Sequence, residues 1–282
     1  MLVNISFKNY SAVVDTLGAQ LRSLKKCGNE ILWQGDEKYW NGTAPILFPI
    51  CGGLKDDSCI INGNRYYIDK HGFASKLEFV PCKIAENSVS MTLTSCADTL
   101  KKYPFQFELK AIFTLTEEGL VTDYIVKNNN SFDMFYSIGS HEGYYCEGGF
   151  ENYDLIFNKI ERFEVCELDG SILSHNKQKI LPDGDKLSLK NEYFEIDALI
   201  FESPNSDEVS LVNRNTKQTI TVGFKDFKNL LVWTIPNASF ICIEPWNGFP
   251  DYSDTDGDFT KKNSIIKIKP LGVSKNTHTI KF

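Results

Sequence analysis

The chain has 282 residues, of which 42% are hydrophobic and 13% aromatic, so it can bury a large core. Its formal net charge is −7 and its lysines are scattered, which argues against nucleic acid or an anionic membrane surface as a partner. The segment MLVNISFKN lacks the pattern of a signal peptide, and no apolar run reaches the roughly 20 residues that cross a bilayer. We therefore expect a cytoplasmic protein that does not bind membranes.

Alternation of apolar and polar residues, which is typical of half-buried strands, recurs along the chain. Residues 61–68 predict a hairpin that turns at Asn62-Gly63, a favoured type I′ pair. Short helical turns are expected at 36–40 and 182–192. Further strands are predicted over 88–96, 105–115, 120–128, 208–214 and 218–224, with a polar loop at 213–217 between the last two.

Turn signals at intervals of roughly 8–12 residues, without any sustained 3.6-residue period, favour an all-β protein. Because no linker or repeat divides the chain, we expect one large antiparallel β-sandwich domain over residues 1–282. The eight cysteines are widely spread and form no CxxC pair. Reduced thiols are therefore expected, and no metal site is predicted.

The most informative segment is ICIEPWNGFPD, residues 241–251. Glu244 ends a strongly apolar run, where an unpaired carboxylate costs several kcal/mol. Pro245 interrupts the strand ladder because it has no N–H group, and Trp246 adds a flat apolar face. An acid beside an aromatic ring suits a site that holds a sugar and moves its protons.

The chain has only four histidines. His71 lies in DKHGFAS, and His141 lies in SIGSHEGYYC between two glycines. A lone histidine in a turn is more often structural than catalytic, unless other reactive groups converge on it. His175 and His278 lie in polar segments and are expected at the surface.

Two more segments are candidates for a site. Asp197 opens the apolar strand DALIFES, where it could contact a ligand or, equally, bond to the nearby backbone of a turn. The segment FPICGGLKD carries Gly52-Gly53 after an apolar run, which suits close approach of the backbone. Neither segment has the spacing of a phosphate-binding loop, and no Gly-x-Ser-x-Gly motif is present.

In order along the chain, the segments FPICGGLKD, HGFA, YPFQFEL, SIGSHEGY, DALIF and IEPWNGFPD resemble those of the aldose 1-epimerases, or mutarotases. The likeness is closest to the bacterial branch encoded near lactose and tagatose genes. It extends over nearly the whole chain and implies a galactose mutarotase-like β-sandwich. The sequence also departs from the family pattern. Gly53 stands where the family has a substrate-binding arginine, and Ser75 stands where a second arginine often occurs. Lys55, Arg65 and Lys76 are the alternatives for a replacement cation.

The resemblance implies that Glu244 is a general base and His141 a general acid, while His71 and Asp197 bind the sugar. Trp246 could stack on the sugar, as could Trp33, although Trp33 and Trp40 are at least as well explained as core residues. The implied reaction opens a pyranose ring and recloses it as the other anomer, with no metal, nucleotide or redox cofactor. The expected partner is a monosaccharide or a sugar phosphate. The sequence leaves the oligomeric state open.

Two other functions remain compatible with these residues. A non-catalytic carbohydrate-binding protein on the same fold would account for the missing arginine. A glycoside hydrolase could use Glu244 and Asp197 as its two carboxylates, provided that both flank one glycosidic bond.

Overall fold

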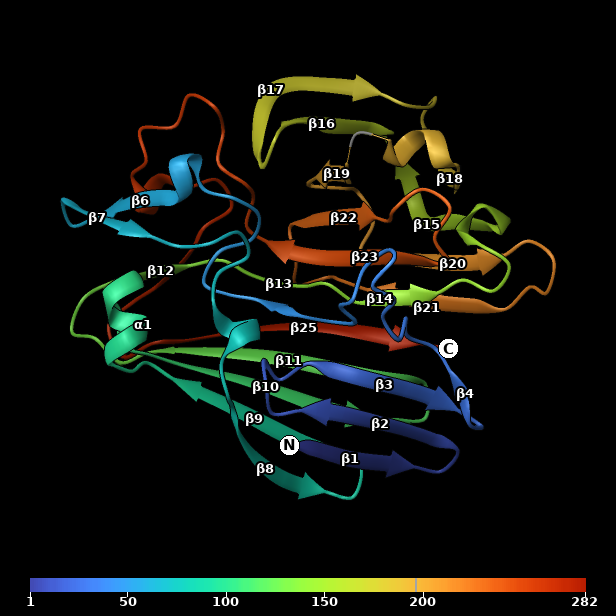
Figure 1. Cartoon of the computed structure of the whole chain (residues 1–282), viewed down its shortest axis with the longest axis horizontal. Helices are drawn as coiled ribbons and strands as arrows, with labels where there is room; N and C mark the ends of the chain where they lie inside the picture. Colours follow the sequence, from blue (N-terminus) through green and yellow to red (C-terminus); the bar gives the residue numbers. More distant parts are fainter. Residues whose placement is uncertain (196) are drawn as a thin grey trace.

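The computed structural model describes residues 1–195 and 197–282, and its secondary structure consists mainly of antiparallel sheets (Figure 1). The largest sheet has nine strands. In spatial order they are β18 (Gly184–Ser188), β15 (Tyr153–Glu161), β20 (Glu208–Asn213), β21 (Thr219–Gly223), β25 (Val273–Lys281), β11 (Gly119–Asn128), β10 (Phe107–Leu115), β9 (Ser88–Thr94) and β8 (Val80–Ala85).

A six-stranded sheet carries the segments that the sequence singles out. Its order is β19 (Leu199–Glu202), β22 (Asn229–Trp233), β23 (Phe240–Asn247), β13 (Ile138–Ser140) and β5 (Ile46–Leu47), while β14 (Gly143–Tyr145) also pairs with β23. In the register of this sheet, Glu244 lies opposite Leu231 and Trp246 lies opposite Gly139.

The remaining elements are smaller. A four-stranded sheet consists of β1 (Leu2–Phe7), β2 (Tyr10–Asp15), β3 (Leu21–Lys26) and β4 (Asn29–Glu30), and it packs on β9 and β10 (Figure 1). Three two-stranded sheets pair β6 (Ser58–Ile61) with β7 (Asn64–Tyr67), β12 (Met134–Tyr136) with β24 (Ile266–Ile268), and β16 (Glu164–Asp169) with β17 (Ile172–Lys179). Helical turns are α1 (Ala97–Lys102), η1 (Lys55–Asp57), η2 (Ala74–Lys76), η3 (Phe150–Asn152), η4 (Asn191–Phe194) and η5 (Phe259–Lys261).

The expected all-β antiparallel architecture is confirmed, as are the strands predicted from alternation. Along β10 every second residue is buried, as the period of a strand requires. The predicted turn at Asn62-Gly63 has φ values of 50° and 77°, as a type I′ turn needs.

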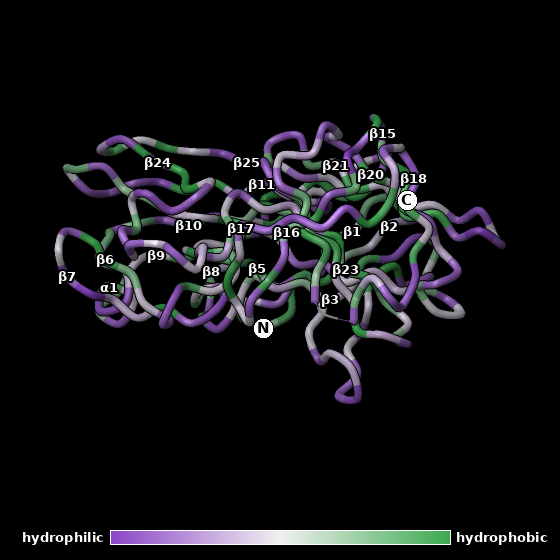
Figure 2. The backbone as a smooth tube through the Cα atoms, turned by 90° about the horizontal axis from the view of Figure 1, so that it is seen from above, coloured by the Kyte–Doolittle hydropathy of each residue, from purple (hydrophilic) through white to green (hydrophobic). Residues whose placement is uncertain are grey.

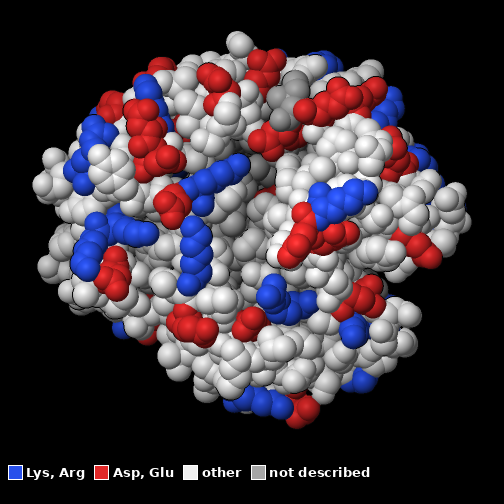
Figure 3. Space-filling view, viewed as in Figure 1, with Lys and Arg blue, Asp and Glu red and all other residues white. Residues whose placement is uncertain are grey.

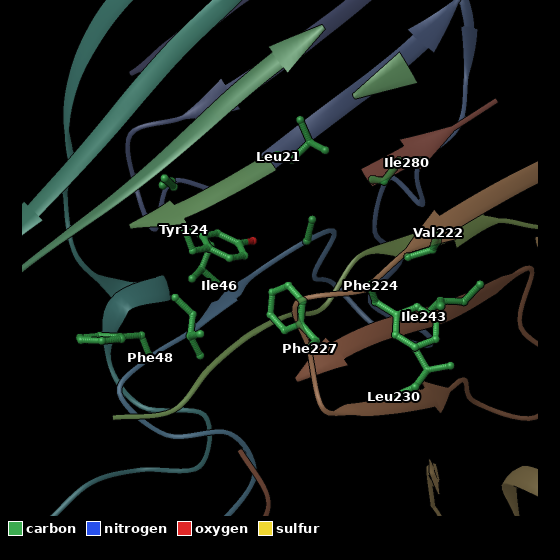
Figure 4. Packing of buried hydrophobic residues seen from close by; sticks show 14 of the residues in the cluster. Leu21, Ile46, Phe48, Tyr124, Val222, Phe224, Phe227, Leu230, Ile243 and Ile280 are labelled. Atoms are coloured by element: carbon green, nitrogen blue, oxygen red, sulfur yellow. The ribbon is translucent and has the colours of Figure 1, made fainter. Parts of the chain in front are cut away.

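The main core lies between the nine-stranded sheet and the two sheets that cover it. Figure 4 shows core residues from different sheets meeting there, such as Tyr124 and Ile280 from the large sheet and Leu230 and Ile243 from the six-stranded one. In Figure 2 the hydrophobic segments gather where strands stack, and the hydrophilic ones occupy the peripheral loops. The second face of the six-stranded sheet lies outside this core and packs in part against the β16–β17 hairpin, whose Cys166 and Leu173 join Ile200, Leu231 and Trp246 in a smaller apolar cluster.

The structure corrects several local predictions. Residues 36–40 form a turn without helical structure. Most of 182–192 is strand β18 and its flanks, and the helical turn η4 begins only at Asn191, at the end of that range. The α-helix present, α1, was not predicted, because six residues are too few to show helical periodicity. His278 was expected at the surface but is fully buried on β25, where Asn276 and Ile280 share its buried side.

No helix of the described chain is long and apolar enough to span a membrane. All eight cysteines lie within the described residues, and each is a free thiol. Five of them are buried.

Candidate active site

An open cleft of about 490 Å³ lies on this second face of the six-stranded sheet, beside the β16–β17 hairpin. In Figure 3 the molecular surface is hollowed near the centre of this face, and charged side chains surround the hollow. The residues that line it are Trp40, Pro45, Leu47, Gly52, Lys70, His71, Ser75, His141, Leu168, Gly170, Ser171, Asp197, Ala198, Ile200, Leu231, Trp233, Glu244, Trp246 and Pro250. The volume falls within the range of about 300–1,000 Å³ that is usual for small-molecule sites.

Strand alternation explains how Glu244 reaches the cleft. Along β23, Ile241 and Ile243 belong to the main core, so the intervening residues face the other way. Glu244 and Trp246 therefore line the cleft from the middle of a fully buried strand. The neighbouring strands extend this face through Leu231, which lies opposite Glu244 in the register.

His141 lies in the short connection between β13 and β14, and its two flanking glycines permit close packing. A Cβ atom at Gly139 would lie 2.7 Å from the indole of Trp246, and one at Gly143 would lie 2.9 Å from the ring of Trp40. The ring centroids of Trp40 and His141 are 5.0 Å apart. Flat rings packed against bare backbone thus hold the histidine segment against β23.

His141 and Glu244 form the closest acid–base contact in the cleft, with 3.4 Å between Nε2 and Oε2. The carboxyl group is almost completely buried, and burial, with the Glu142 carboxylate as a second cause, raises the pKa of Glu244 well above its ordinary value. Burial lowers the pKa of His141 to about 4. Burial therefore favours the uncharged form of both groups, a neutral imidazole beside a protonated carboxyl group.

His71 lies on the opposite wall, 5.8 Å from His141 between ring centroids. Its backbone has a positive φ of 66°. The next residue is Gly72, where an added Cβ atom would lie only 2.1 Å from the carbonyl oxygen of Phe48. Nδ1 of His71 accepts a hydrogen bond of 3.2 Å from the Gly52 N–H group. Burial and the nearby His141 lower the pKa of His71 well below its ordinary value. A neutral ring that accepts at Nδ1 carries its proton on Nε2, which leaves Nε2–H as a donor.

Asp197 lines the cleft, and its Oδ1 also accepts a hydrogen bond of 2.8 Å from the N–H group of Ala198. Both interpretations of this residue from the sequence are therefore compatible with its position. Trp246 lines the cleft but is only 3% exposed. Trp40 and Trp233 line it with partly exposed rings, whereas Trp33 is buried and stacks on Phe240.

The position of Gly53 explains why it cannot carry a long side chain. A Cβ atom there would lie 2.7 Å from both the backbone oxygen and the Oγ of Ser171, at the tip of the β16–β17 hairpin. This tip occupies the space into which an arginine at position 53 would extend. Within the described residues, Lys70 is the lysine or arginine that lines the cleft. Lys55, Arg65 and Lys76 instead bind Ser253, Ser58 and Asp69.

One cluster at the cleft wall, which includes the buried Cys242, has metal-ligand chemistry. One ligand atom each from His141, Cys242 and Glu244 lies within 4.8 Å of the others, since Cys242 and Glu244 are two residues apart on one face of β23. These three could converge on an ion such as zinc. Burial raises the pKa of the Cys242 thiol well above its ordinary value, so binding would require removal of a strongly held proton.

Sequence reasoning missed a second histidine–carboxylate pair directly behind the cleft. Nε2 of His278 lies 3.1 Å from Oε1 of Glu142, and both residues are buried. The available signals were the alternation of β25, which buries His278 with Ile280, and the position of Glu142 beside His141.

Comparison with known proteins identifies the family of this chain. The profile of the aldose 1-epimerase family matches residues 1–267. The plasmid-encoded and chromosomal LacX proteins of Lactococcus lactis subsp. lactis are each 35% identical to the chain, with 99% of both sequences covered.

Solved structures agree. A galactose mutarotase-like protein from Lactobacillus casei superposes with a TM-score of 0.92 at 26% identity, covering 100% of this chain and 99% of that one. A galactose mutarotase related enzyme from Lactobacillus acidophilus gives 0.93 at 27% identity, with 100% and 97% covered. The chain therefore belongs to the aldose 1-epimerase family.

Proposed function

We propose that this protein is an aldose 1-epimerase, which interconverts the α and β anomers of a hexose or hexose derivative by acid–base ring opening. The observation that carries the proposal is the 3.4 Å contact between His141 and Glu244 in a cleft large enough for one sugar ring. Family membership supports the same reaction class.

The reaction needs one proton acceptor and one proton donor on either side of the hemiacetal. We assign Glu244 as the base that takes the proton of the C1 hydroxyl group, and His141 as the acid that protonates the ring oxygen. The C1–O5 bond then breaks, its electrons remain on O5, and C1 becomes an aldehyde carbon. Rotation about C1–C2 and the reverse proton transfers give the other anomer, so atoms and charge balance.

The protonation state of the pair fits this chemistry. Acid–base exchange requires one labile proton shared between His141 and Glu244, and burial favours the arrangement in which both groups are uncharged. Hydroxyl groups of a bound sugar that donate to Glu244 favour the carboxylate and move the proton to His141. A positioned acid and a positioned base each contribute about 10²–10⁴-fold to such a reaction.

We assign the remaining lining groups to substrate binding. His71 donates through Nε2–H, Asp197 accepts from sugar hydroxyl groups, and Trp246 supplies an apolar wall. Trp40 and Trp233 are more exposed than Trp246 and offer faces for the C–H side of the ring. Lys70 is the cation available to a hydroxyl or anionic group at the mouth of the cleft.

We also propose that the protein works in the reducing cytoplasm. Cys27, Cys82 and Cys96 are exposed free thiols. Such thiols persist where glutathione and thioredoxin keep them reduced. Mass spectrometry of the native protein from its host, with alkylation of free thiols, tests this assignment, and disulfides among these cysteines would contradict it.

Optical rotation of freshly dissolved α-galactose and α-glucose, and then of aldose phosphates, tests the activity. The wild-type protein should accelerate the approach to equilibrium for at least one of these sugars. Glu244→Gln should abolish the acceleration, while Glu86→Gln, at an exposed ion pair with Lys83, should not. No acceleration of any sugar by the wild type would refute the proposal. Sugar-dependent thermal stabilisation without turnover would instead support a binding protein.

A further inference from the structure

Glu142 and His278 form a buried pair that the proposed chemistry does not use. We propose that they are positioning residues, whose hydrogen bond fixes the segment carrying His141 so that the imidazole stays opposite Glu244. This inference rests on the function proposed above for the cleft. It assigns a role in the site to two residues that do not contact the substrate.

The pair joins the two layers of the sandwich. His278 lies on β25 of the nine-stranded sheet, and Glu142 lies between β13 and β14 on the six-stranded side. The contact of 3.1 Å between His278 Nε2 and Glu142 Oε1 is therefore an anchor that spans the core. The exposed fractions of the two residues are 0% and 2%.

Glu142 is linked to both members of the acid–base pair. It follows His141 directly in the chain. Its backbone oxygen accepts a hydrogen bond of 3.3 Å from the N–H group of Ile243, the residue before Glu244. A shift of the Glu142 side chain would therefore be transmitted to the histidine through the chain and to the glutamate through β23.

Fold stability alone does not account for such a pair. Two packed apolar side chains often stabilise a core as well as a buried polar pair, whereas removing the imidazole leaves a buried carboxylate without its partner. The pair is further confined by the Tyr124 ring, which lies 5.6 Å from His278 between centroids at an angle of 30°. A buried polar pair held this tightly is expected where it fixes the position of a neighbouring group.

Electrostatics couples the two pairs as well. Burial would raise the pKa of Glu142, but His278 and nearby hydrogen bonds hold it below its ordinary value, so the group is an anion. Its charge is one reason that the pKa of Glu244 is raised. The groups near enough to interact with Glu142 are His278, Ser140, Tyr124, Tyr144, Cys242, His141 and Glu244, and those that interact with Glu244 are Glu142, His141, Cys242, Lys70, Asp197 and Trp246.

The first test is kinetic and uses Glu142→Gln, His278→Gln and the double variant. The pair His175–Asp254, which has a 2.8 Å contact at the surface, provides the control His175→Gln. Each single change should lower kcat by roughly 10- to 100-fold, as small misplacements of a catalytic group do, with little change in KM. The double variant should be no worse than the worse single variant, and Glu142→Asp should recover part of the activity. The control should match the wild type.

The pH profile separates positioning from a purely structural role. Because the Glu142 charge raises the pKa of Glu244, Glu142→Gln should move the acidic limb of kcat/KM to lower pH. A folded variant with lower melting temperature but unchanged kcat and unchanged pH limb would overturn the proposal. If Glu142→Gln does not fold, His278→Gln, which leaves the Glu142 charge in place, decides the question through kcat, and a folded variant with unchanged kcat would overturn the proposal.

The second test needs no activity. With only four histidines in the chain, single substitutions assign their imidazole NMR signals. Glu142→Gln should shift the signals of both His278 and His141, whereas Asp254→Asn should leave His141 unchanged. Signals of His141 that stay the same in folded Glu142→Gln would overturn the positioning role. If the wild type lacks mutarotase activity, the proposed function fails, and this readout still decides whether the buried pair positions His141.

Discussion

Two histidine–carboxylate pairs lie back to back in this protein and differ in nearly every electrostatic respect. In the cleft, His141 and Glu244 are 3.4 Å apart, and the pKa of the carboxyl group is raised. Between the sheets, His278 and Glu142 are 3.1 Å apart, and the pKa of the carboxyl group is lowered. His141 and Glu142 are neighbours in sequence, yet His141 lines the cleft, whereas Glu142 contacts His278 between the two sheets.

The difference shows that burial alone does not set the charge of a carboxyl group. Glu142 and Glu244 are both almost fully buried. Oε2 of each glutamate has no hydrogen-bond partner among the described residues, but Oε1 of Glu142 is bonded at 3.1 Å to the imidazole of His278, whereas the imidazole of His141 lies 3.4 Å from Oε2 of Glu244 without a hydrogen bond. The first arrangement suits a fixed anchor, and the second suits a group that must gain and lose a proton.

The largest expected effect comes from breaking the cleft pair at its histidine. His141→Asn keeps a polar side chain but removes the acid, so kcat should fall by about 10²–10⁴-fold. Polarimetry under saturating sugar measures this loss. His175→Asn, at an exposed histidine with a carboxylate partner, is the matched control and should retain full activity. Wild-type rates in His141→Asn would remove this residue from the mechanism.

Gly139→Ala should disturb both pairs together, because the added Cβ lies 2.7 Å from Trp246 and the strand leads into His141 and Glu142. We expect a loss of about 1–3 kcal/mol in the free energy of unfolding, as overpacking gives, and a lower kcat. Urea unfolding and polarimetry measure the two effects. Gly184→Ala, where the nearest atom is 3.5 Å away, should be close to neutral. Equal effects at both glycines would contradict the packing argument.

Glu244→Gln should alter the pH dependence of stability. Since the folded-state pKa of Glu244 is raised above 4.5, its contribution is complete below that pH. It is lost as pH rises toward the raised folded-state value, at up to about 1.4 kcal/mol per pH unit. Glutamine has no proton to lose, so in urea unfolding the variant should gain stability relative to the wild type as pH rises above about 4.5 toward the raised folded-state pKa. A stability difference that does not change with pH would show that Glu244 has an ordinary pKa.

The smallest effect is expected at the rim of the cleft. Lys70→Met should raise KM by about three- to tenfold and leave kcat nearly unchanged, because it removes one partly exposed charged hydrogen bond to the sugar. Lys76→Met, whose ammonium group pairs with Asp69 outside the cleft lining, is the control. An unchanged KM for every accepted sugar and sugar phosphate would exclude Lys70 from substrate binding.

Much of the fold could be predicted because it is recorded in local patterns. Alternation along 105–115 and 120–128 predicts strands, and Asn62-Gly63 predicts a turn, since each rule depends on the chain's own period or dihedral preference. The short helix α1 left no such pattern. Residues 182–192 look polar and turn-like because β18 lies at an edge of the sheet.

The site was predictable only in part. Glu244 stands out because a carboxyl group in an apolar strand is costly unless it has a function. The alternation of side chains along a strand then predicts that Trp246 lies on the same face. His278 does not stand out, because its partner Glu142 is 136 residues away and only the packing of two sheets brings them together. The contact between Ser171 and Gly53 likewise depends on where a hairpin tip lies, which no local pattern records.

The central claim is that His141 and Glu244 act as one proton-transfer unit on a sugar hemiacetal. Magnetisation exchange between the anomeric protons of a sugar at equilibrium tests it most directly, with wild type, His141→Asn, Glu244→Gln and the double variant. We predict rapid exchange with the wild type, nearly none with each single variant, and no further loss in the double variant. Single variants that exchange anomers at the wild-type rate, or losses that simply multiply in the double variant, would contradict it.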